Sequence, residues 1–309
     1  MQKYIDFRSD TVTQPTDEMR QAMLNAVVGD DMMGEDPTVN ELQRMAAEIS
    51  GKEAALFVPS GVFGNQLAFY VHCQRGDEIV ISNDAHPVQH EAGSVAVISG
   101  ANMRTITTDR QWFTWDEAKK YIRFEEDLHF PRTALIEVQN TLSNGDVMPL
   151  EEMKKIYENA QKHNIAVHLD GARIFNAATY LKVPAKEIAQ YANSVMFCLS
   201  KGLASPVGSM LAGTKEFIAQ ALKKRKIMGG AMRQVGILAA AGIVSLTKMV
   251  HRLEKDHQHA KILAQNFAKF DEVFEINLET VKTNMFFMKP KFEKRDEFLS
   301  ILKDYGILT

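Results

Sequence analysis

The sequence predicts an α/β fold in which helices flank a mostly parallel β-sheet. Short, continuously apolar runs alternate with helical patterns along the first 230 residues, and strands that are buried on both faces have this character. A chain of 309 residues also has room for one large domain or two unequal ones. The predicted strands are 54–58, 78–82, 95–99, 133–138, 165–170, 194–200 and 207–213, and the clearest helices between them are Gln66–His72, Leu150–His163 and Pro184–Tyr191.

The two ends of the chain differ from this pattern. Residues 1–15 are polar and end in proline, so we predict an N-terminal arm, followed by a helix for which Thr16 is the N-cap. We assign residues 16–240 to a large domain that binds a cofactor. Residues 241–309 predict a smaller α+β domain, which we expect to be incomplete because the chain ends where a strand begins. Its predicted parts are an apolar helix over Ala231–Leu253, an amphipathic helix over His251–Phe270, strand-like residues Asn284–Met288 and a helix over Asp296–Tyr305.

Composition excludes several classes of protein. The net charge is −3, which gives the chain no general electrostatic reason to bind nucleic acid or an anionic membrane. Cys73 and Cys198 lie in apolar runs without the spacing of zinc ligands, so we predict reduced core cysteines and no metal site. No apolar run approaches a membrane span, and residues 1–15 lack the apolar segment of a signal peptide. We therefore expect a cytoplasmic protein.

Two local patterns sit where an α/β sheet binds ligands. Ser60 and Gly61 form a turn between an apolar run and a helix, and free N–H groups at a helix N-terminus form a phosphate cradle. The alternative is an ordinary strand-to-helix turn. Asp170 lies at the carboxyl end of a buried strand and needs a cationic partner. That partner is either Arg173, in a structural ion pair, or the protonated ring nitrogen of a cofactor.

The third pattern is Lys201, which follows the next buried run. A lysine there is uncommon unless it is paired or forms a covalent bond, and a desolvated lysine is a Schiff-base nucleophile. The alternative is a lysine that extends to the surface. A phosphate turn, a carboxylate and a lysine together are what pyridoxal phosphate requires. A nucleotide-binding Rossmann domain is excluded, because no G-x-G-x-x-G follows a predicted strand.

The sequence resembles the low-specificity L-threonine aldolases of the β-eliminating lyase group. These are fold type I pyridoxal-phosphate enzymes, with an aspartate-aminotransferase-like sheet. The resemblance implies pyridoxal 5'-phosphate as cofactor and retro-aldol cleavage of L-threonine, L-allo-threonine and related β-hydroxy amino acids to glycine and an aldehyde. It also implies a homodimer or homotetramer with active sites at subunit interfaces. The resembling segments are 7–16, 29–42, 51–66, 129–133, 168–177, 195–209 and 229–243.

The resemblance also implies a role for each candidate residue. Lys201 matches the Schiff-base lysine, and Asp170 matches the partner of the pyridinium nitrogen. His86 matches the histidine that stacks on the cofactor ring and helps to handle the β-hydroxyl proton. Ser60, Gly61 and Val62 match the cup that holds the phosphate. Ser9 and Arg173 match the groups that bind the substrate carboxylate, and Arg173 is also a predicted cofactor-binding residue. His129 matches a second histidine near the substrate, and Lys226 and Arg233 match residues that reach a neighbouring subunit's phosphate.

The chain departs from the family pattern at a few positions. Val62 replaces a threonine, Met33 a tyrosine and His90 an aromatic residue. The family's usual E-N-T-H reads Q-N-T-L here, with Gln139 in place of the glutamate and Leu142 in place of the histidine. The chain also ends before the segment in which the family carries another substrate-binding arginine. Two alternatives therefore stay open: a related pyridoxal-phosphate β-eliminating lyase, and a catalytically impaired or truncated protein of this fold.

Overall fold

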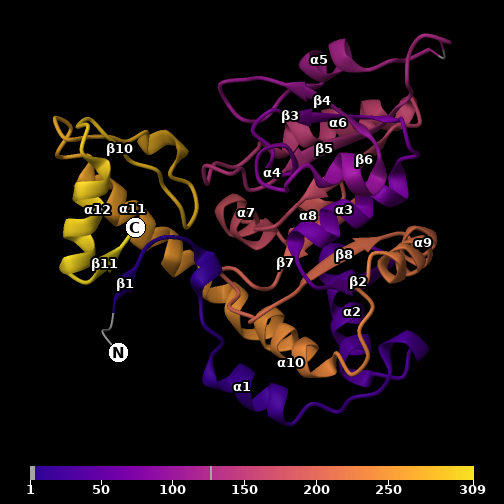
Figure 1. The fold of residues 1–309 in the computed structure, drawn as a ribbon, viewed down its shortest axis with the longest axis horizontal. Helices are drawn as coiled ribbons and strands as arrows, with labels where there is room; N and C mark the ends of the chain where they lie inside the picture. The colour runs from indigo at the N-terminus through magenta and orange to yellow at the C-terminus, as the bar shows by residue number, and fades with distance from the viewer. Residues whose placement is uncertain (1–3, 126) are drawn as a thin grey trace.

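A mostly parallel sheet lies at the centre of the computed structural model, which describes residues 4–125 and 127–309 (Figure 1). The strand order is β2-β8-β7-β6-β5-β3-β4, and only β8 runs antiparallel to its neighbours. The predicted α/β class is thus confirmed. The strands are β2 (Ala54–Val58), β3 (Glu78–Ser82), β4 (Asn102–Ile106), β5 (Thr133–Gln139), β6 (Ala166–Asp170), β7 (Ser194–Cys198) and β8 (Ser209–Gly213).

One predicted strand is wrong and one strand was missed. The run Val95–Ser99 forms a π-helical turn. Its first and last residues are buried, whereas Val97 is 77% exposed, so the segment buries one helical face and forms no ladder. The edge strand β4 was missed because its sequence, NMRTI, is mostly polar and half-exposed, and continuous apolar character marks only strands covered on both faces.

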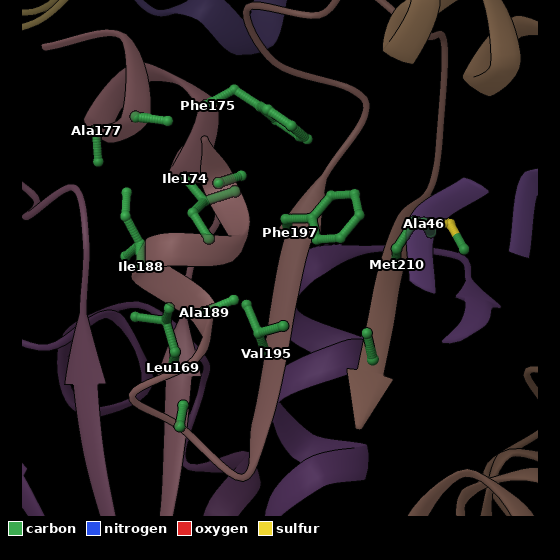
Figure 2. Close-up of a cluster of buried hydrophobic side chains, with 14 of the residues drawn as sticks. Ala46, Leu169, Ile174, Phe175, Ala177, Ile188, Ala189, Val195, Phe197 and Met210 are labelled. Carbon is green, nitrogen blue, oxygen red and sulfur yellow. The ribbon is translucent and has the colours of Figure 1, made fainter. Parts of the chain in front are cut away.

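Helices cover both faces of the sheet, and the core lies between the layers. Figure 2 shows α7 and α8 packed on β6 and β7 through Leu169, Ile188 and Phe197. The rings of Phe175 and Phe197 meet edge to face, with centroids 5.4 Å apart. The helices of this part of the chain are α1 (Asp17–Leu24), α2 (Pro37–Ser50), α3 (Gly61–His72), α4 (His86–Gln89), α5 (Trp115–Ala118), α6 (Leu150–Lys162), α7 (Ile174–Leu181), α8 (Ala185–Ala189) and α9 (Lys215–Ile227).

The two ends of the chain meet in a small separate sheet. In the arm, β1 (Ile5–Asp6) pairs in parallel with β11 (Ile307–Leu308), and Thr16 caps α1 as predicted. The C-terminal elements lie to one side of the central sheet (Figure 1). They include α11 (Leu253–Phe267), β9 (Phe274–Glu275), its antiparallel partner β10 (Lys289–Pro290) and α12 (Arg295–Asp304).

The strand-like segment Asn284–Met288 is not a strand. Side chains at its start make the contacts instead: Thr283, the residue before it, donates to the carbonyl of Gly145, and Asn284 donates to Asp10. The C-terminal part of the chain is therefore bound to the arm and to the loop after β5.

A long helix joins the central sheet to the C-terminal elements. It runs from Gly236 to Phe267 through α10 (Gly236–Val244), and by length and composition alone it could cross a membrane. However, 56% of its most apolar window is buried, and α10 packs against α1 and α2. Much of the apolar surface of this helix is therefore buried inside the protein. The boundary that we predict at residue 240 falls within α10.

The carboxyl ends of six strands lie at one edge of the sheet, because β2, β3, β4, β5, β6 and β7 all run in the same direction. Ser60 follows β2, His86 follows β3, Asp170 ends β6 and Lys201 follows β7. Open α/β sheets bind ligands at this edge.

We predict that the buried cap Asp36 is essential for the packing of α2 on α10. Its carboxylate accepts hydrogen bonds from the backbone N–H groups of Thr38 and Val39, and also from that of Gly236 at 2.8 Å. Asp36→Ala removes a helix cap and leaves a buried N–H unpaired, so it should lower the free energy of unfolding by about 2–4 kcal/mol. Urea denaturation measures this loss.

The matched control is Asp36→Asn, which keeps a capping oxygen and should lose much less stability. Equal stability of Asp36→Ala and the wild type would contradict the importance of the cap.

Candidate functional site

The predicted phosphate turn forms the N-terminus of α3. Ser60 is the N-cap, and its hydroxyl accepts a hydrogen bond from the backbone N–H of Phe63. The N–H groups of Gly61 and Val62, at the first two helical positions, have no partner within the helix. A Cβ at Gly61 would lie 2.8 Å from the sulfur of Cys198, so the turn is packed on the end of β7. These N–H groups suit an anion such as phosphate.

Asp170 is a buried carboxylate at the end of β6, with 5% of its surface exposed. The hydrogen bonds to it come from neutral donors: the side-chain amide of Asn65 at 2.8 Å and the backbone N–H of Ala172 at 3.0 Å. Of the two cationic partners that the sequence allows, Arg173 is the wrong one, because its guanidinium pairs with Asp10. The chemistry of Asp170 therefore fits a protonated ring nitrogen.

Lys201 lies in the loop after β7 and is half-buried. Its carbonyl accepts a hydrogen bond from the hydroxyl of Thr13 at 2.8 Å, so the N-terminal arm holds the loop that carries the lysine. Lys201 comes three residues after Cys198, which packs on Gly61. The lysine and the phosphate turn thus share one edge of the sheet with Asp170.

Arg173 forms a bidentate ion pair with Asp10, at 2.8 Å and 2.5 Å. Asn284 adds a hydrogen bond to the same carboxylate at 3.1 Å. Burial by itself raises the pKa of Asp10, but Arg173 outweighs it and the pKa lies below its ordinary value. Ser9, the other predicted ligand of the substrate carboxylate, caps the turn that begins at Asp10. Ser9 and Arg173 are thus brought together.

His86 is the first residue of α4, and its ring is held from one side. Its Nδ1 lies 2.9 Å from the Glu91 carboxylate, which has no exposed side-chain surface. The Glu91 carboxylate also accepts hydrogen bonds from Asn65 at 3.1 Å and Gln66 at 2.6 Å. An ionised carboxylate only accepts, so Nδ1 of His86 carries a proton and Nε2 is left to exchange one. The ring of His90 lies beside that of His86, with centroids 5.4 Å apart.

Three of the predicted site residues, His129, Lys226 and Arg233, do not lie with Asp170, Lys201 and the Ser60 turn. His129 is exposed and precedes β5, at the opposite edge of the sheet. The ring of its neighbour Phe130 lies under Arg123, which pairs with Glu78 at the amino end of β3. Two further cations are also exposed: Lys226 at the end of α9, and Arg233, which pairs with Asp30.

Sequence reasoning missed the polar residues that surround the site, namely Asn65, Glu91, Asp10 and Asn284. Asn65 and Glu91 carry a weak signal, because each is a polar residue in a stretch of mostly apolar or small neighbours. Asp10 and Asn284 carry no such signal, because the hydrogen bond between them joins segments that lie far apart in the sequence. Among residues 4–125 and 127–309, no group of His, Cys, Asp or Glu side chains could hold a metal ion.

Glu137 is a further buried acid that the sequence analysis missed. It is fully buried on β5, and neither carboxyl oxygen has a hydrogen-bond partner among the described residues. Burial raises the pKa of Glu137 well above its ordinary value, and the charge of Asp170 raises it further. Glu137 therefore binds a proton in the folded protein that it would release in the unfolded chain.

We predict that Glu137→Gln stabilises the protein increasingly as the pH rises. Above the unfolded-state pKa of about 4.3, the wild type loses stability by about 1.4 kcal/mol per pH unit until the folded-state pKa is reached. Glutamine has no proton to lose, so the variant escapes this loss. Thermal unfolding at pH 5 and pH 8 measures the difference, with the exposed Glu158→Gln as control. A difference in melting temperature that stays constant with pH would contradict the prediction.

Comparisons with known proteins identify the family of this chain. The β-eliminating lyase family model matches residues 6–291. A probable low-specificity L-threonine aldolase 2 from Arabidopsis thaliana is 44% identical, over 99% of this chain and 88% of that protein. A low specificity L-threonine aldolase from Escherichia coli (strain K12) is 44% identical, over 92% of this chain and 84% of that one.

Solved structures share the fold. The crystal structure of a putative L-allo-threonine aldolase from Listeria monocytogenes superimposes with a TM-score of 0.81 at 22% identity, covering 94% of this chain and 80% of that one. The sheet is that of the fold type I pyridoxal-phosphate enzymes. The extent of the family match and the identity with the aldolases show that this chain belongs to the β-eliminating lyase family.

Proposed function

We propose that this protein is a pyridoxal-phosphate-dependent aldolase that cleaves L-threonine, L-allo-threonine and related β-hydroxy amino acids to glycine and an aldehyde. The observation that carries the proposal is the meeting of three groups at one edge of the sheet: the Ser60 turn, Asp170, whose hydrogen bonds from the described residues come from neutral donors, and Lys201. Proteins of the β-eliminating lyase family use pyridoxal phosphate, and relatives with 44% identity are named for threonine cleavage.

The chain's own residues fit the cofactor. The N–H groups of Gly61 and Val62, with the Ser60 hydroxyl, would hold its phosphate, and Asp170 would hold the ring nitrogen in its protonated form. Lys201 would hold its aldehyde carbon. When bound, pyridoxal phosphate withdraws electrons from the Cα of an amino acid and so weakens the bonds to that carbon.

Arg173 and Ser9 would bind the carboxylate of the substrate. Asp10 engages Nε and one terminal nitrogen of Arg173, which fixes the plane of the guanidinium and leaves the other terminal nitrogen for the substrate. Holding the carboxylate sets the rotation about Cα and thereby which bond is aligned for cleavage. Alignment of Cα–Cβ gives aldol cleavage.

His86 would accept the proton of the substrate β-hydroxyl. The contact with Glu91 keeps the proton of the neutral ring on Nδ1, so Nε2 is the basic atom. Removal of the hydroxyl proton lets the oxygen form the carbonyl of the aldehyde as the Cα–Cβ bond breaks. Glu91 also stabilises the imidazolium that results.

We predict that Lys201→Ala abolishes both cofactor attachment and turnover. Wild-type protein incubated with pyridoxal phosphate and reduced with borohydride should carry a pyridoxyl group on the Lys201 peptide, detected by mass spectrometry. The same protein should release glycine and acetaldehyde from L-threonine. The control Lys182→Ala alters the C-cap lysine of α7, at the opposite end of that helix from Arg173, and should behave as wild type.

Two results would contradict the proposal. A pyridoxyl group on another lysine, with full turnover in Lys201→Ala, would remove Lys201 from the site. Release of ammonia and a 2-oxo acid, with no glycine, would identify a related β-eliminating lyase instead.

We also propose that the protein is a homo-oligomer, a dimer or tetramer, whose active sites lie between subunits. His129 lies at the opposite edge of the sheet from Lys201, so it would reach a substrate only in another copy. Met33, in the turn whose Asp31 N–H bonds to the Arg233 carbonyl, is 71% exposed, and Leu24, in the helix α1 that packs on α10, is 77% exposed. A contiguous exposed apolar patch is typical of an interface.

Mixing two inactive variants tests this arrangement. Lys201→Ala lacks the lysine, and the double variant Lys226→Ala/Arg233→Ala lacks the cations proposed to reach a neighbour's phosphate. Unfolding and refolding them together should restore roughly a quarter of wild-type activity, because half of the mixed dimers' sites receive both intact parts. Light scattering should give a mass of at least twice 34.7 kDa. A fully active monomer, or no restored activity, would contradict the proposal.

We further propose a cytoplasmic location. Cys73 and Cys198 are both free and buried, which suits a reducing compartment.

A further inference from the structure

The buried side chain of Asn65 forms hydrogen bonds with Asp170, Glu91 and His168. Asn65 lies on α3, is 1% exposed, and uses its whole side chain. The amide nitrogen donates to Asp170 at 2.8 Å and to Glu91 at 3.1 Å. The amide oxygen lies 3.2 Å from Nε2 of His168. A single buried amide thus joins the proposed partner of the cofactor ring to the carboxylate that holds His86.

The hydrogen bonds continue from His168 away from the site. Nδ1 of His168 lies 2.8 Å from the hydroxyl of Ser194, and that hydroxyl lies 2.8 Å from Nε2 of His72. The rings are held by aromatic neighbours: Phe69 meets His168 edge to face, and Phe217 stacks on His72. We call His168, Ser194 and His72 the relay.

The direction of every hydrogen bond in the relay follows from the carboxylates. Ionised Asp170 and Glu91 only accept, so the Asn65 nitrogen must face them and its oxygen must face His168. His168 then donates through Nε2 and accepts at Nδ1 from the Ser194 hydroxyl. That hydroxyl in turn accepts from Nε2 of His72. Each donor therefore points toward the site.

Both histidines of the relay are neutral, as this pattern requires. Burial lowers the pKa of His168 to about 3. Burial, together with the nearby charge of Lys224, lowers the pKa of His72 to about 4. A neutral imidazole has one donor and one acceptor nitrogen, so each ring has a single tautomer that satisfies its neighbours.

We propose that Asn65 is a positioning residue which orients Asp170 and the Glu91–His86 pair together, and that the relay holds its amide in the required direction. The roles of Asp170 and His86 in this statement rest on the proposed function, whereas the tautomers do not. Without the Ser194 hydroxyl, His168 is free to move its proton to Nδ1. Its bare Nε2 would then face the Asn65 oxygen, and the amide would turn and present that oxygen to two carboxylates.

Ser194→Ala tests the relay with the loss of one oxygen atom. Nitrogen-15 NMR of the full chain, labelled at histidine, reports the tautomers of His168 and His86, assigned through His168→Gln and His86→Asn. The wild type should show His168 protonated at Nε2 and His86 protonated at Nδ1. Ser194→Ala should show mixed tautomers for His168 and a shifted visible absorption of the bound cofactor. Its kcat should fall about 3- to 10-fold, the value of one neutral hydrogen bond, with little change in KM.

Three further variants separate positioning from a loss of packing. Ser194→Thr restores a hydroxyl and should recover the wild-type tautomers and kcat. Ser99→Ala removes another buried hydroxyl, which bonds to the carbonyl of Val95 and takes no part in the relay, and should change neither. Asn65→Leu, similar in volume, should release the tautomer of His168 and shift the visible absorption of the bound cofactor, while His86 stays protonated at Nδ1 because Glu91 still accepts from it.

Several outcomes would overturn the proposal. These are wild-type His168 protonated at Nδ1, an unchanged His168 tautomer in Ser194→Ala, or a changed tautomer with unchanged kcat and visible absorption. If the wild type releases no glycine from threonine, the proposed function fails by itself. The His168 tautomer in Asn65→Leu then decides the positioning role, and an unchanged tautomer would refute it.

Discussion

The constraint around which the site is arranged is the buried carboxylate of Asp170, which accepts its hydrogen bonds from neutral donors among the described residues. Asp170 ends β6 inside the protein, and its hydrogen bonds come from an amide and a backbone N–H. Neutral donors compensate only part of the loss of hydration of a buried charge. The binding of a protonated ring nitrogen would compensate the rest of this lost hydration. This explains why Asn65 is fully engaged and why it in turn requires neutral histidines behind it.

The ends of the chain complete the site at the same edge of the sheet. Asp10, from the arm, holds Arg173 and accepts a hydrogen bond from Asn284, while Thr13 holds the carbonyl of Lys201. The pairing of β1 with β11 joins the arm to the C-terminal elements. The substrate side of the site is thus assembled from segments that meet only in the folded chain, and the cofactor side comes from strand ends.

The difference between residues at strand ends and residues from distant segments also explains which parts of the site the sequence could predict. Lys201, Asp170 and the Ser60 turn each adjoin a buried strand, so local pattern and position were enough to find them. Asn65 and Glu91 carry only a weak local signal and Asp10 carries none, because their contribution lies in tertiary hydrogen bonds. The same limit explains the errors in the fold: the run at Val95 is β-branched and apolar, yet it buries one helical face, and β4 is an edge strand without an apolar pattern.

The most direct test of the central claim is the protonation state of the cofactor's ring nitrogen. Pyridoxal phosphate labelled with nitrogen-15 at this atom, bound to the wild type near pH 8, should give the chemical shift of a protonated pyridine. Asp170→Asn should give that of an unprotonated ring, and Asp10→Asn should match the wild type. An unprotonated ring nitrogen in the wild type, or a protonated one in Asp170→Asn, would contradict the role assigned to the buried carboxylate.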